Sequence, residues 1–148
     1  MKFDYDRLVE APASTVWDAL TDTAAIEPHL QGSAKVVSTG SNSFRISMKI
    51  SLGFLRPTVN ANVQLSNISI RRFTIELSGK SMGAEVLGKA EVILKVAGSE
   101  SESTVVQLIG SVETSGMLKK VADSKIKAAA IGFLESYFAS VERAFSRV

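Results

Sequence analysis

The sequence contains no cysteine and a single histidine, His29. Without cysteine the chain forms no disulfide, thiolate zinc site, iron-sulfur cluster or catalytic thiol. Every Ser-His-Asp arrangement would have to use His29, and the chain has no GxSxG, HExxH or phosphate-binding-loop motif. The sequence therefore predicts a protein with no catalytic site, no metal site and no cofactor.

Long apolar runs are missing as well. The longest, AAAIGFL at residues 128–134, is much shorter than the roughly 20 residues that span a bilayer. The first ten residues, MKFDYDRLVE, alternate like a strand and lack the apolar core of a signal peptide. We therefore expect a cytoplasmic protein, for which peripheral association with a membrane stays open. With 17 basic against 15 acidic residues, the charge balance argues against a nucleic-acid partner.

The 148 residues suit one compact domain, and their periodicity predicts its elements in order. Residues 2–10 alternate as a strand, and Val16, Trp17 and Leu20 then follow at helical spacing. Asp22 can cap a second short helix, which Pro28 keeps short. The runs that predict six further strands are 34–39, 43–52, 58–68, 71–79, 84–97 and 103–112.

From Ser115 the apolar period becomes helical. The stripe consists of Leu118, Ala122, Ile126, Ala129, Phe133 and Tyr137, and it is widened by neighbours that include Val121 and Phe138. Such a helix has to lay its apolar face on the sheet. We predict an α+β fold in which a curved seven-stranded antiparallel sheet wraps around a long C-terminal helix, in the order β-α-α-β6-α. The aromatic residues Trp17, Phe133, Tyr137 and Phe138 are expected in its core.

This order resembles the helix-grip fold of the START-like (Bet v 1-like, SRPBCC) superfamily. Three stretches are similar to the CoxG-like family, named for the CoxG subunit of carbon monoxide dehydrogenase: APASTVWDALTD, GAEVLGKAEVIL with Gly88 and Ala90, and the terminal VETSGMLKKVADSKIKAAAIGFLESYF. The chain has Gln31-Gly32 where that family commonly has Pro-Gly. The resemblance implies a pocket between sheet and helix for a lipid, isoprenoid or quinone-like molecule. It also implies an accessory role that links a molybdenum hydroxylase of the carbon monoxide dehydrogenase type to the membrane.

One end of the predicted sheet has apolar turns. Successive turns of a meander lie at alternate ends, so GFLRP (53–57), GKSMG (79–83) and the ETSGMLKK junction (113–120) share one end. The candidate ligand-binding residues are Ile26, Leu30, Phe54, Leu55, Met82, Met117, Leu118, Val121 and Phe133. The candidate membrane or partner contacts are Arg56, Lys80, Lys119 and Lys120. Three interpretations of this end stay open. It could admit a ligand, it could dock on an anionic membrane or a partner protein, or Phe54 and Leu55 could fold back and close it.

The remaining polar candidates have ordinary explanations beside the functional ones. We interpret His29, two residues after Glu27, as part of a solvated short helix rather than an acid/base pair. We expect the strand carboxylates to face water, namely Glu76, Glu85, Glu91 and Glu113. The polar row Asn60, Asn62 and Gln64 lines either the outer face or the pocket. Two alternative functions stay open: a polyketide-cyclase-like or hydrolase-like enzyme that uses Glu76, Glu91 or Tyr137, and a protein-interaction module. The oligomeric state is not predicted.

Overall fold

The computed structural model describes residues 1–30, 34–49, 56, 58–81, 83–97 and 102–146. The strands are β1 (Lys2–Val9), β2 (Lys35–Gly40), β3 (Ser43–Lys49), β4 (Thr58–Ser69), β5 (Arg72–Ser81), β6 (Ala84–Val96) and β7 (Thr104–Gly116). The α-helices are α1 (Ala13–Thr21), α2 (Thr23–Ile26) and α3 (Asp123–Ser146), and 3-10 helices span Glu27–His29 and Met117–Lys120. The predicted element order is confirmed.

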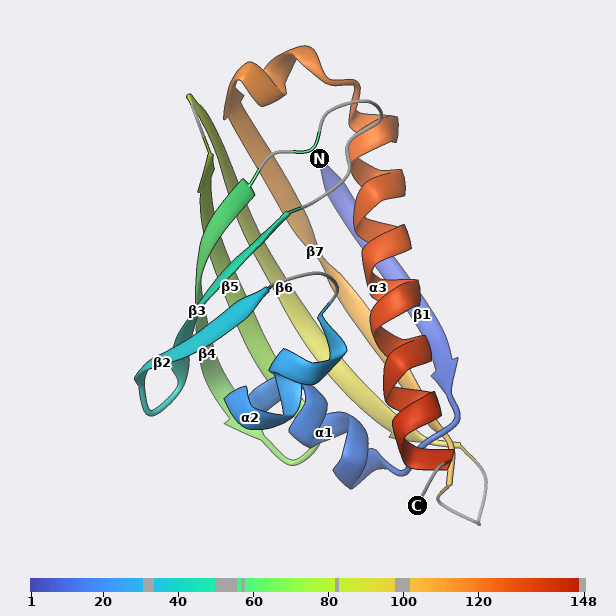
Figure 1. Ribbon diagram of the computed structural model, residues 1–148. Coiled ribbons are helices and arrows are strands. Elements are labelled where there is room, and N and C mark those ends of the chain that lie inside the picture. Colours follow the sequence, from blue (N-terminus) through green and yellow to red (C-terminus); the bar gives the residue numbers. More distant parts are fainter. Residues whose placement is uncertain (31–33, 50–55, 57, 82, 98–101, 147–148) are drawn as a thin grey trace.

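The strands form one antiparallel sheet in the order β1-β7-β6-β5-β4-β3-β2. Strands β2 to β7 are a meander, and β1 closes the sheet by pairing with β7 from Lys2↔Ser111 to Val9↔Thr104. Figure 1 shows the sheet curving around α3, with α1 and α2 against its lower end. This is the predicted α+β arrangement.

Alternation along the strands decides which side chains reach the concave face. On β4, Ala61, Val63 and Leu65 are buried, whereas the alternate positions are exposed. The outward positions are the polar row of Asn60, Asn62 and Gln64, so this row belongs to the outer face. The sequence could not choose between the two faces because either phase of the alternation satisfies the pattern.

The long helix begins later than the sequence pattern suggested. Strand β7 continues to Gly116, the 3-10 helix Met117–Lys120 follows, and α3 starts only at Asp123. Gly116 has φ 67°, and a Cβ there would lie 1.9 Å from the Gly83 carbonyl oxygen. The chain therefore turns at a position that only glycine can occupy, and Leu118 precedes the helix instead of opening it.

A polar network fixes α3 to β1. The Tyr5 hydroxyl donates to Glu135 Oε1 at 2.6 Å, and Arg7 pairs with Glu135 and, at 2.7 Å, with Glu142. The second Glu142 oxygen accepts from the Glu10 backbone N–H at 2.8 Å. Burial and the Glu135 carboxylate raise the pKa of Tyr5, so its hydroxyl stays a donor.

Candidate functional site

Burial of the concave face falls toward one end of β4 and β6. On β6, Leu94 and Val92 are 3% and 2% exposed, but Val86 toward the other end is half-buried. Strand β4 shows the same gradient from the buried Leu65 to the half-buried Val59. We call the end of the concave face where apolar side chains remain half-buried the open half, and its residues include Met48, Val59, Ile75, Leu77, Val86 and Val112.

The opposite region, the packed half, contains the fully covered core. Its residues include Val9, Val16, Phe73, Val106, Phe138 and Val141, all less than 2% exposed. The ring of the half-buried Trp17 on α1 packs against this core and meets Phe73 edge-on with centroids 5.3 Å apart. The Tyr137 hydroxyl donates to the Ala19 carbonyl, which joins α3 to α1. The short helices therefore cover only this half of the sheet.

The exposure of the apolar residues of α3 also rises toward the open half. Tyr137, Phe138 and Val141 are at most 5% exposed, whereas Phe133 is 37% exposed. The expectation that Phe133 is a core residue is therefore wrong, because the apolar helical stripe continues past the point where core side chains cover it. Phe133 shares the helix face of Tyr137, on which its ring stacks at 6.1 Å. It lies where the packed half gives way to the open half.

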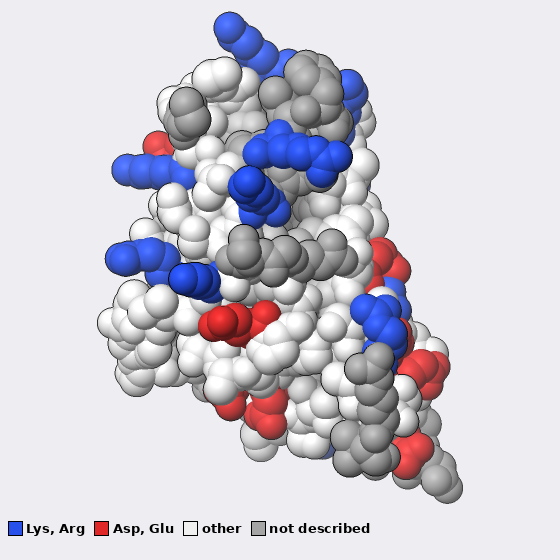
Figure 2. Space-filling model, in the orientation of Figure 1, with Lys and Arg blue, Asp and Glu red and all other residues white. Residues whose placement is uncertain are grey.

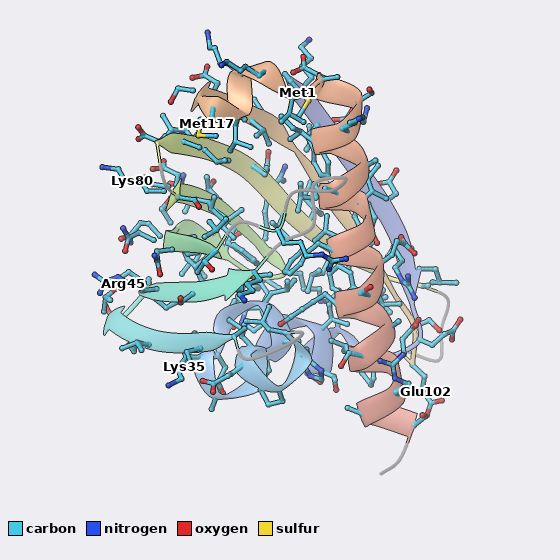
Figure 3. All side chains as sticks on the ribbon, turned by 45° about the horizontal axis from the view of Figure 1, so that its top comes forward. Met1, Lys35, Arg45, Lys80, Glu102 and Met117 are labelled. Atoms are coloured by element: carbon cyan, nitrogen blue, oxygen red, sulfur yellow. The ribbon has the colours of Figure 1, made fainter. Side chains whose placement is uncertain are left out.

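The end of the open half is formed by two turns that lie far apart in the sequence. The Met117 backbone N–H donates to the Gly83 carbonyl at 3.2 Å, and the Met117 side chain is 62% exposed. In Figure 3, Met117 and Lys80 lie at the same end of the sheet. The prediction that the GKSMG and ETSGMLKK stretches share one end is confirmed for these residues.

The other predicted ligand-binding residues are in different places. Ile26 and Leu30 belong to the buried core cluster, and Leu30 also borders an open surface groove of about 460 Å³ beside Pro28. Leu118 is 8% exposed and Val121 is half-buried. Phe54, Leu55 and Met82 lie outside the described residues. The structure therefore brings Met117, Leu118 and Val121 together at the open half, and it places Ile26 and Leu30 in the core.

The predicted cationic contacts are exposed, namely Arg56, Lys80, Lys119 and Lys120. In the view of Figure 2, Lys and Arg gather mostly over the upper part of the molecule and Asp and Glu over the lower part. The 3-10 helix with Lys119 and Lys120 lies at the top of the same view. The open half thus ends in a mainly basic surface.

His29 differs from its interpretation as a solvated residue. Its Nδ1 lies 2.9 Å from Ser140 Oγ, its ring meets that of Tyr137 at 5.7 Å, and burial lowers its pKa. Glu27 is not its partner, because that carboxylate accepts from the Val36 backbone N–H at 3.3 Å. His29 therefore fixes the 3-10 helix to α3, a role that no local sequence signal could reveal.

The strand carboxylates face outward, as expected from their alternation. Glu76 lies 3.6 Å from Lys89, and Glu91 pairs with Arg72, both across β5 and β6 on the outer face. Within the described ranges, no group of three His, Cys, Asp or Glu side chains is placed to hold a metal ion. None of the helices in the described part of the chain is both long enough and apolar enough to cross a membrane.

Comparison with protein families decides the relationship. Residues 7–146 match the family model of CoxG, the carbon monoxide dehydrogenase component for which the family is named. The chain belongs to the CoxG family. The resemblance found in its three sequence stretches is thereby confirmed, and the match includes every helix, strands β2 to β7 and the last three residues of β1. No curated protein matches this CoxG-family chain significantly.

Solved structures agree with the helix-grip fold of this CoxG-family chain. A conserved protein from Geobacillus kaustophilus has a TM-score of 0.88 at 12% identity, with 99% of this chain and 96% of that chain covered. A START superfamily protein from Mycobacterium smegmatis has a TM-score of 0.71 at 16% identity, with 99% and 97% covered. A STAR-related lipid transfer protein fragment from Xanthomonas axonopodis has a TM-score of 0.61 at 10% identity, with 95% and 85% covered. The fold is therefore the helix-grip fold that this chain shares with these START-like structures.

Proposed function

We propose that the protein binds a small apolar or amphipathic molecule on the open half, between the sheet and α3. The observation that carries this proposal is a group of inward-facing aliphatic side chains that remain half-buried, among them Val59, Leu77 and Val86. Covering apolar surface is favourable by about 25 cal/mol per Å². A ligand with an aliphatic or isoprenoid chain would gain this free energy without rearranging the packed half.

We propose further that the binding is non-catalytic. The inward hydroxyls nearest to α3 already have structural partners, since Tyr137 donates to Ala19 and Tyr5 donates to Glu135. The carboxylates Glu76 and Glu91, which a cyclase-like enzyme would need on the concave face, are paired on the outer one. These placements support a carrier over an enzyme.

Family membership suggests the partner enzyme and the class of ligand. As a CoxG-family member, the protein would serve a molybdenum hydroxylase of the carbon monoxide dehydrogenase type, with a lipid, isoprenoid or quinone as ligand. The exposed Met117 and the neighbouring Lys119 and Lys120 would let the end of the open half meet an anionic membrane, where each cation contributes about 1 kcal/mol. The ligand would enter there.

The proposal is tested by a substitution that places a larger side chain on the concave face of the open half. Gly88 faces the concave side, and a Cβ there would lie 3.8 Å from Leu77 Cβ, an ordinary contact. Gly88→Leu therefore places a branched side chain in the proposed site. We expect this substitution to weaken the binding of decylubiquinone at least tenfold. Binding is measured through the change in protein fluorescence. The melting temperature should stay within a few degrees of that of the unmodified protein.

The matched control is Leu87→Ala, next to Gly88 on the outward face and 46% exposed in the unmodified protein. It should leave the affinity for decylubiquinone unchanged. Unaltered binding in Gly88→Leu, or equal losses in both variants, would contradict the proposal. Binding of a phospholipid with a fluorescent acyl chain, measured in parallel, separates lipid from quinone as the preferred ligand class.

A further inference from the structure

Two Lys and Glu pairs face each other across the same two strands, and only one forms an ion pair. Glu76 and Lys89 are opposite in the β5–β6 register and lie 3.6 Å apart. Lys80 and Glu85 are also directly opposite on the outer face, four residues further along. Neither forms an ion pair within 4 Å with any residue that the structure describes.

A groove of about 540 Å³ occupies this place at the ends of β4, β5, β6 and β7. Lys80 and Glu85 contribute the charges of its lining, and Asn60 and Ser115 on the same face add an amide and a hydroxyl. Asn60, Lys80, Glu85 and Ser115 form one cross-strand row, because each is the register partner of the next. The groove thus presents a cation, an anion and neutral hydrogen-bonding groups on a rigid sheet.

We propose that this groove binds a zwitterionic group with an ammonium next to a phosphate or carboxylate. Lys80 binds the anion together with Asn60, and Glu85 binds the ammonium. A group with only one charge would leave either the lysine or the glutamate without a counter-charge, which lowers its affinity. An ion pair between Lys80 and Glu85 would compete with the ligand, but such a pair at the surface contributes only about 0–1 kcal/mol.

The groove lies on the outer side of the sheet end, so this inference goes beyond the proposed binding on the concave face. Its neighbour is Met117, whose sulfur lies 3.9 Å from the position that a Cβ would take at Gly83, another lining residue. A phospholipid head group with an ammonium and a phosphate and a soluble phosphodiester zwitterion both have the required chemistry. The experiment uses both sources.

The first arm titrates the isotope-labelled protein with glycerophosphoethanolamine and follows backbone amide shifts. We expect saturable shifts centred on Lys80, Glu85 and Ser115, with at least fivefold weaker binding of glycerol phosphate and of ethanolamine alone. Lys80→Met and Glu85→Gln should each weaken binding of the zwitterion at least fivefold. The matched controls Lys89→Met and Glu76→Gln, on the same strands and face, should leave binding unchanged.

The second arm measures sedimentation with phosphatidylethanolamine-containing vesicles. Binding that Lys80→Met and Glu85→Gln abolish, and that the two controls retain, supports the inference and identifies the lipid as the source. Saturable binding of the soluble zwitterion alone supports it with a soluble source. Absence of binding in both arms overturns it, as does equal affinity for glycerol phosphate. Decylubiquinone binding in the same variants stays as in the unmodified protein, which separates this site from the concave one.

Discussion

The packed half and the open half belong to the same strands and the same helix, yet they differ in what covers the concave face. Around Phe73 and Phe138 the side chains of α1, β1 and α3 leave 1% of each residue exposed. Around Leu77 and Val86 the sheet is equally apolar but only half-buried. Because the strands run through both halves without a break, the packed half fixes the geometry of the open one. Stability and binding surface are thus separated along the strand direction.

Two phenylalanines of α3 provide the sharpest test of this separation. Phe138→Ala should lower the free energy of unfolding by about 3–5 kcal/mol, because it leaves a cavity between Tyr5 and Tyr137. Phe133→Ala, five residues earlier, should lower it by about 1 kcal/mol or less, because that ring is 37% exposed. Urea unfolding of both variants measures the difference. Equal losses would mean that the open half is packed like the rest of the core.

Gly132 provides a second test, at the boundary of the halves. It lies within α3, and apart from the backbone of its own helix and its chain neighbours no described atom lies within 4 Å of the position where a Cβ would be added. Close approach to the sheet, one explanation for a glycine here, is therefore excluded. Gly132→Ala should raise the free energy of unfolding by about 1 kcal/mol, because alanine has the higher helix propensity. A loss of stability on thermal unfolding would contradict this view of the helix.

The smallest expected effect is a dependence on pH in the packed half. Burial lowers the pKa of His29 below its ordinary value of 6.5, so the unfolded chain binds its proton more readily than the folded one. The resulting contribution is present above pH 6.5 and is lost as the pH falls through the folded-state pKa. His29→Gln should flatten the stability profile between pH 7.5 and 5.5 when thermal melts of the two proteins are compared. Identical profiles would show that His29 does not titrate differently in the two states.

Much of the fold could be predicted because alternation and helical spacing are local signals. The period-2 pattern of β4 and β6 identified their strands to within a residue or two, and Asp22 caps α2 as predicted by accepting from the Ala24 N–H. The shared end of the Gly83 and Gly116 turns followed from counting strands. These inferences needed only the chain order and elementary geometry.

The parts that sequence reasoning missed depend on contacts between distant residues. The start of α3 was misplaced because Gly116 turns against the Gly83 carbonyl, 33 positions earlier in the chain. His29 contacts Ser140, which is more than 100 positions away in the sequence. The ion pairs of Arg7 with Glu135 and Glu142 span a similar separation. The groove around Lys80 and Glu85 likewise needs the register of four strands. Local patterns carry no information on such pairings.

The pairing of β1 with β7 also has a kinetic consequence. The β1–β7 register pairs join residues 2–9 to residues 104–111, whereas neighbouring strands of the meander from β2 to β7 also follow one another in the sequence. Forming the long-range contacts requires the larger loss of chain entropy, so β1 and α3 should join a preformed meander late in folding. The ion pairs of Arg7 with Glu135 and Glu142 connect these two late elements. Removing these ion pairs should therefore speed unfolding while leaving the folding rate nearly unchanged. The ion pairs of Arg7 would then set the lifetime of the native state.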